Sequence, residues 1–109
     1  LDLLVQIGGT NVSLSGVRTK LLKHPLVKDA AVRVMRPNEG SRLKAFIVLN
    51  NHDYYSSKDV LKEVNQLEIT KQLQHYINTH LSTAERPKAL TFGLDIPVNN
   101  IGKLCDWTV

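Results

Sequence analysis

The chain has 109 residues, of which 42% are hydrophobic and 22% charged, a balance typical of a folded globular domain and not of a disordered segment. That length allows one hydrophobic core. The formal net charge is +4, but the basic residues are scattered, so charge alone does not indicate a nucleic-acid-binding surface.

No apolar run reaches the roughly 20 residues that a membrane helix needs, and no signal-peptide pattern opens the chain. The single cysteine, Cys105, excludes an internal disulfide and is typical of a reducing compartment, so we expect a cytoplasmic protein. The first residue is Leu1 and not Met, and we therefore expect a fragment of a longer polypeptide.

The first elements are a hairpin and a helix. Two short extended pieces meet at Gly8-Gly9, which predicts a tight β-turn. The next segment predicts a helix with Ser15 as its N-cap, and Pro25 ends it. The apolar stripe of this helix consists of Val17, Leu21 and Leu22.

Two strands follow. Residues 27–35 are rich in Val and Ala, and residues 42–50 read RLKAFIVLN. The sequence PNEG at 37–40 predicts a turn between them, so we expect an antiparallel pair.

The second half predicts a polar loop at 51–59, helices at 59–66 and 68–81, and a last strand at 86–94. The stripe of the longer helix reads Ile69, Leu73, Tyr76, Ile77 and Leu81. The fold class expected is α+β: a two-layer sandwich with an N-terminal β-hairpin and a small, mainly antiparallel sheet packed by about three helices.

The residues do not form a self-contained active site. The histidines have no metal-like spacing, so we expect no metal site, and there is no Gly-x-Ser-x-Gly motif. Gly102-Lys103 lacks the rest of a phosphate-binding loop, and only Phe46 and Phe92 are candidates for stacking on RNA bases. By itself the domain is predicted to be catalytically incomplete.

Four motifs in order resemble one family. They are LDLLVQIGG at the start, LLKHPLVKDAAV at 21–32, GSRLKAFIVLN at 40–50 and IPVNNIGKL at 96–104. Together they resemble the C-terminal lid domain of the adenylate-forming superfamily, which includes acyl- and aryl-CoA synthetases, nonribosomal adenylation domains and luciferases. The resemblance covers nearly the whole chain, so residues 1–109 are expected to be one lid domain whose large N-terminal domain is absent.

The resemblance implies roles for five residues. Asp2 falls on the hinge between the two domains, and Gly8 and Gly9 fall on the hairpin loop that faces CoA or a carrier arm. Lys103 falls on the lysine that catalyses adenylation, and Gly102 beside it leaves room for a close approach to the nucleotide.

The implied enzyme is an ATP-dependent acid–thiol ligase. Such an enzyme uses Mg-ATP to convert a carboxylic acid to an acyl-adenylate, and it then transfers the acyl group to CoA or to a phosphopantetheine carrier protein. The partners implied are the missing N-terminal domain, the acid and the thiol acceptor, with no membrane and no nucleic acid. We expect the fragment alone to bind none of the cofactors and to be inactive.

Two kinds of alternative stay open. The family motif Gly-Glu-x-Glu is replaced by Ser15-Gly16-Val17-Arg18, so both expected glutamates are missing. An unusual subfamily therefore stays open, either one that only adenylates or one whose thiol acceptor is a carrier protein. The alternative of another class is a stand-alone basic α+β interaction or nucleic-acid-binding module.

Overall fold

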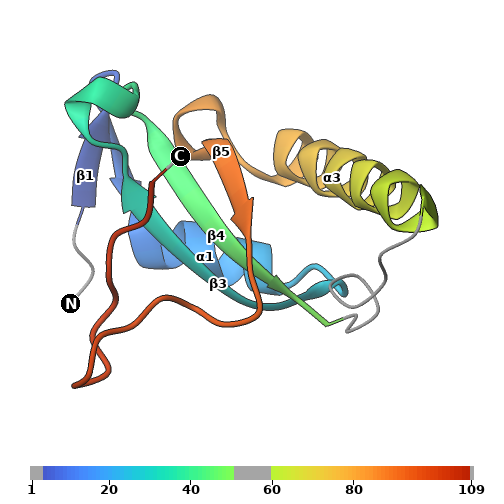
Figure 1. Cartoon of the computed structure of the whole chain (residues 1–109). Coiled ribbons are helices and arrows are strands. Elements are labelled where there is room, and N and C mark those ends of the chain that lie inside the picture. Colours follow the sequence, from blue (N-terminus) through green and yellow to red (C-terminus); the bar gives the residue numbers. More distant parts are fainter. Residues whose placement is uncertain (1–3, 51–59, 109) are drawn as a thin grey trace.

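The computed structural model describes residues 4–50 and 60–108, which form two small sheets and two α-helices (Figure 1). The two-layer α+β fold expected from the sequence is confirmed. None of the helices in the described ranges is long and apolar enough to cross a bilayer.

The N-terminal hairpin pairs β1 (Leu4–Ile7) with β2 (Thr10–Ser13) in antiparallel register. Gly8 and Gly9 both have positive φ angles, 57° and 83°, as a type I′ turn requires. Glycine adopts these angles without the steric cost that a Cβ adds, so the predicted turn is confirmed.

Helix α1 (Leu14–Leu22) follows the hairpin directly. Its N-cap is Ser13, whose Oγ accepts a hydrogen bond from the backbone N–H of Gly16 at 3.1 Å. The prediction that Ser15 caps the helix was wrong, because the helix begins immediately after β2. Val17 and Leu21 of the predicted stripe are fully buried, while Leu22 is only partly buried.

The second sheet has the order β3-β4-β5. Strand β3 (Val27–Val34) is antiparallel to β4 (Leu43–Leu49), as predicted, and the 3₁₀ turn η1 (Pro37–Glu39) lies between them. Strand β5 (Pro87–Phe92) runs parallel to β4. Because parallel neighbours need a crossover, the long helix α3 (Val60–His80) and the 3₁₀ turn η2 (Thr83–Glu85) connect them.

The two helices predicted at 59–66 and 68–81 are one continuous helix from residue 60 onwards, and the sequence contains no proline or glycine that would break it. Leu73, Ile77 and Leu81 of its predicted stripe are buried, and Ile69 packs beside them. The loop predicted at 51–59 lies outside the described residues.

Strand β4 is buried on both faces. Leu43, Ala45, Ile47 and Leu49 belong to the core shared with α1 and α3. The alternate residues Lys44, Phe46 and Val48 point to the other face, as the period of two in a strand requires. There the C-terminal segment 93–108, which we call the tail, covers the sheet: the rings of Phe46 and Trp107 meet edge to face at 5.6 Å. The tail therefore covers the face of β4 that the helices leave open.

Candidate functional site

The tail carries Lys103 on a loop that its own backbone holds in shape. Val98 and Leu104 form an antiparallel bridge across the base of the loop. The N–H of Asn99 donates to the carbonyl of Lys103 at 2.9 Å, and the N–H of Gly102 donates to the carbonyl of Asn99 at 3.0 Å. Gly102 has a φ of +82°, which favours glycine at the tip.

The side chain of Asn99 completes the turn. Its Oδ1 accepts hydrogen bonds from the N–H groups of Ile101 and Lys103, each at 3.0 Å. Asparagine side chains that accept from the backbone two residues on are a common way to close such turns. The backbone of Lys103 is thus fixed through both its N–H and its carbonyl group.

The ammonium of Lys103 is presented to the outside. The residue is exposed, and within the described part of the chain no carboxylate or carbonyl pairs with its Nζ. A Cβ built on Gly102 would meet nothing within 4 Å, so the tip of the loop is open. A cation of this kind has the geometry to approach an anionic ligand that comes from outside the chain.

A charge cluster fixes the far end of the tail. The Nζ of Lys44, a fully buried residue of β4, lies 2.9 Å from Glu39 Oε1 and 2.8 Å from Asp106 Oδ1. It also donates to the backbone carbonyl of Trp107 and lies 5.2 Å from the centre of that ring. The ammonium therefore joins β4, the η1 turn and the tail at one point.

Two arginines surround this point. The Nε atoms of Arg33 and Arg36 each lie 3.5 Å from a carboxylate oxygen of Asp106. The hydrogen bond from Lys44 and the neighbouring cations hold the pKa of Asp106 below its usual range. Glu39 raises the pKa of Arg36 through a hydrogen bond and its charge.

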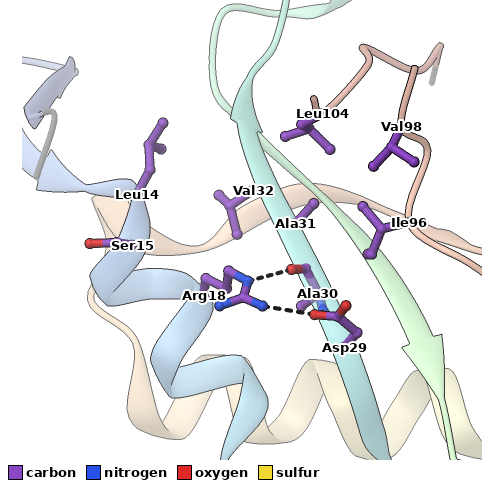
Figure 2. Close-up of a pocket in the computed structure, with 10 residues that line it drawn as sticks. All are labelled: Leu14, Ser15, Arg18, Asp29, Ala30, Ala31, Val32, Ile96, Val98 and Leu104. Atoms are coloured by element: carbon purple, nitrogen blue, oxygen red, sulfur yellow. Dashed lines mark hydrogen bonds and ion pairs between the residues drawn. The ribbon is translucent and has the colours of Figure 1, made fainter. Parts of the chain in front are cut away.

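A cleft of about 350 Å³ lies between α1 and the base of the Lys103 loop (Figure 2). Strand β3 forms its floor, and Leu14 of α1 faces Val98 and Leu104 of the loop across it. Arg18 donates from Nε to the carbonyl of Ala30 at 2.8 Å and from Nη2 to Asp29 at 2.9 Å. Arg18, which stands where the resemblance leads us to expect a glutamate, thus ties α1 to β3.

The structure does not bring the predicted site residues together. The Gly8-Gly9 turn is exposed and lies at one end of the molecule, next to Arg42 at the start of β4. The loop that carries Gly102 and Lys103 reaches the opposite end (Figure 1). Asp2, the predicted hinge residue, lies outside the described residues.

Sequence reasoning missed the residues that order the tail. Asn99 is a turn-forming residue type shortly before a Gly-Lys pair, so its role in the turn could have been predicted from the sequence. The cluster of Lys44, Glu39 and Asp106 could not be predicted from the sequence, because Asp106 lies far along the chain from the other two residues. Trp107 holds the tail against the sheet, because its side chain is buried and its ring packs on that of Phe46. Since Trp107 packs on it, Phe46 is not an open platform for stacking on nucleic-acid bases.

The chain is similar to known ligases along nearly its whole length. It is 36% identical to a 4-coumarate–CoA ligase of Cereibacter sphaeroides over 97% of this chain and 22% of that protein. It is also 36% identical to a 4-coumarate–CoA ligase of Halorhodospira halophila over 95% of this chain and 24% of that protein. The chain thus spans less than a quarter of the length of these relatives.

A solved structure of an acyl-CoA synthetase of Brucella canis superposes on the chain with a TM-score of 0.65. It is 26% identical and matches 94% of this chain and 17% of that one. The family model described as AMP-binding enzyme C-terminal domain matches residues 19–103, from α1 through the exposed lysine. The chain therefore belongs to the family of AMP-binding enzyme C-terminal domains.

Proposed function

We propose that this chain is the mobile lid of an ATP-dependent acyl- or aryl-CoA synthetase-like ligase, with Lys103 as the catalytic lysine of adenylation. The observation that carries the proposal is the exposed ammonium of Lys103, which pairs with no residue in 4–50 or 60–108 and stands on a loop fixed by Asn99. The family match, which extends to residue 103, supports it.

In the proposed reaction, a carboxylate oxygen of the acid attacks the α-phosphorus of Mg-ATP. The bond from this phosphorus to the oxygen that leads to the β-phosphate breaks, and pyrophosphate leaves. Two anions approach each other in this step, and negative charge accumulates on the phosphoryl oxygens. The ammonium of Lys103 bridges the carboxylate and the α-phosphate and so reduces the repulsion between them.

The distance between the two predicted sites favours a lid that changes orientation. The Lys103 loop and the Gly8-Gly9 turn lie at opposite ends of the domain, so one orientation cannot place both in a single active site (Figure 1). In our proposal, a rotation about Asp2 withdraws Lys103 after adenylation. The hairpin turn then faces the thiol of CoA or of a carrier protein.

The partners proposed are the large N-terminal domain of the same polypeptide, the acid, Mg-ATP and the thiol acceptor. Two relatives are named 4-coumarate–CoA ligases, so an aromatic propenoic acid is the first substrate class to try. Competition between CoA and a holo-carrier protein for the acyl group distinguishes the two acceptors.

The test is pyrophosphate exchange in the full-length polypeptide that contains this chain. Loss of a preorganised charge at the reacting atoms costs about 3–4 kcal/mol, so Lys103→Ala is expected to slow exchange by roughly 10²- to 10³-fold. Lys71→Ala, at an exposed position on α3, is the matched control.

Thioester formation from supplied acyl-adenylate is measured in parallel. The Lys103→Ala variant is expected to keep this half-reaction, because the lysine is then outside the site. Exchange at the wild-type rate in Lys103→Ala would refute the assignment.

A further inference from the structure

We propose that Lys44 is a positioning residue for Lys103: its buried ammonium fixes the tail through Asp106 and Trp107 and so sets where the Lys103 loop stands. This inference rests on the proposed catalytic role of Lys103. We call the cluster of Lys44, Glu39, Asp106 and Trp107 the tail anchor.

The first argument is the burial of Lys44. In the described part of the chain it is the one charged residue that is buried as a whole, at 0% exposure, and the side chain of its partner Glu39 is only 4% exposed. Taking an ammonium out of water is costly, and an apolar residue of similar volume commonly stabilises a strand at least as well. A buried lysine is therefore poor evidence for a purely stabilising role, whereas in some proteins a buried charge specifies one arrangement among alternatives.

The second argument is what the ammonium contacts. Its partners lie on segments far apart in the chain: Glu39 of η1, and Asp106 with the carbonyl of Trp107 in the tail. An apolar contact is non-directional and tolerates sliding of the tail along β4, but three charge-assisted contacts to one Nζ do not. The tail anchor thus fixes the register of the tail on the sheet.

The third argument is the short path from the anchor to Lys103. Asp106 follows Lys103 by three residues, and Cys105 between them donates its N–H to the carbonyl of Pro97 at 2.8 Å. The loop between Pro97 and Cys105 is thus closed at its base. Strand β5 fixes the chain that enters the loop, and the tail anchor fixes the chain that leaves it. If the chain that leaves the loop shifts, the loop turns as a unit, and Lys103 moves with it.

The size of the expected effect follows from the sensitivity of catalysis to position. A displacement of about 1 Å in a catalytic group can cost up to roughly 100-fold in rate. Loss of the tail anchor is therefore expected to slow adenylation at least about tenfold, while leaving the half-reaction that does not use Lys103 nearly intact.

The main variant is Asp106→Asn in the full-length polypeptide. It keeps the size of the side chain and leaves Lys44 paired with Glu39, so that the fold is retained. Lys44→Met is the second variant, and it removes the ammonium itself, while Glu39 keeps the hydrogen bonds from the backbone N–H and the guanidinium of Arg36. The matched controls are Glu68→Gln and Lys71→Met, both at exposed positions on α3.

Pyrophosphate exchange and thioester formation from supplied acyl-adenylate are measured for each variant. A second readout does not depend on activity. Trp107 is the single tryptophan of the 109-residue chain, so the tryptophan fluorescence of that chain reports whether the tail is packed on β4. We expect Asp106→Asn to slow exchange about tenfold or more, to change thioester formation less than about twofold and to shift the emission of Trp107 towards longer wavelength.

Two results would overturn the inference: exchange at the wild-type rate in Asp106→Asn, or an equal loss in both half-reactions, which marks a general structural role. Lys103→Ala in the same experiment separates the two proposals. Unchanged exchange in that variant refutes the role of Lys103 and this inference with it. A loss in Lys103→Ala with normal exchange in Asp106→Asn refutes the positioning role alone.

Discussion

Gly93, directly after β5, is the residue whose substitution tests most sharply how the tail is packed. A Cβ built on Gly93 would lie 2.4 Å from Cζ and 2.8 Å from Cε1 of the Phe46 ring. Ordinary van der Waals contacts of a Cβ begin at 3.4 Å, so Gly93→Ala forces the ring to retreat by about 1 Å. The ring packs edge to face on Trp107, and its movement disturbs that contact as well.

Overpacking of this kind typically costs 1–3 kcal/mol. Taking ~2 kcal/mol and an unfolding entropy of about 0.23 kcal/mol/K for a domain of this size, we expect Gly93→Ala to lower the melting temperature by roughly 9 °C. Urea denaturation of the 109-residue chain gives the free energy of unfolding directly, with Trp107 emission as the probe.

Replacing Phe46, whose ring the new Cβ would meet, tests whether this clash causes the loss of stability. In a Phe46→Leu background, Gly93→Ala is expected to cost less than about 0.5 kcal/mol, because the smaller side chain no longer occupies the space. Gly9→Ala is the matched control: it meets open space, and its cost comes from a φ of +83°, so Phe46→Leu does not relieve it. An equal cost of Gly93→Ala in both backgrounds would refute the steric explanation.

Two further predictions concern stability. Ser13→Ala removes the N-cap of α1 and is expected to lower the free energy of unfolding by about 1 kcal/mol, whereas Ser15→Ala costs less; a larger loss in Ser15→Ala would restore Ser15 as the cap. Hydrogen bonds from the backbone N–H of Ser82 and from Lys20 hold the pKa of Glu85 below its usual 4.5. The stability that this carboxylate contributes is therefore present above pH 4.5 and is lost as the pH falls through its lower folded pKa. The difference in unfolding free energy between wild type and Glu85→Gln should shrink as the pH falls from about 5 to about 3, and a pH-independent difference would contradict the assignment.

Patterns that are local in the chain were predictable. The pair Gly8-Gly9 predicted the hairpin turn because only glycine adopts two successive positive φ angles freely. The stripe of Leu73, Ile77 and Leu81 predicted a buried helical face because a helix repeats every 3.6 residues. The motifs that end in Gly102-Lys103 indicated the family, and the match over residues 19–103 confirms it.

Features that depend on partners distant in sequence were not predictable. Both Ser13 and Ser15 are suitable N-caps, and the choice between them depends on where β2 ends against β1. The parallel pairing of β5 with β4 depends on how α3 packs, and neither strand's own residues specify it.

Lys44 shows most clearly the difference between features that the sequence predicts and features that depend on the tertiary structure. In the sequence it is one lysine in an otherwise apolar strand, and such a side chain is expected to be exposed. It is buried because the tail, some 60 residues later, returns to the other face of β4 and brings Asp106 to its ammonium. The sequence by itself determined most of the elements, the family and the position of the Gly-Lys pair, since these depend on local spacing. The tertiary structure alone decided which charge holds that loop in place, because ion pairing depends on distance in space and not on distance along the chain.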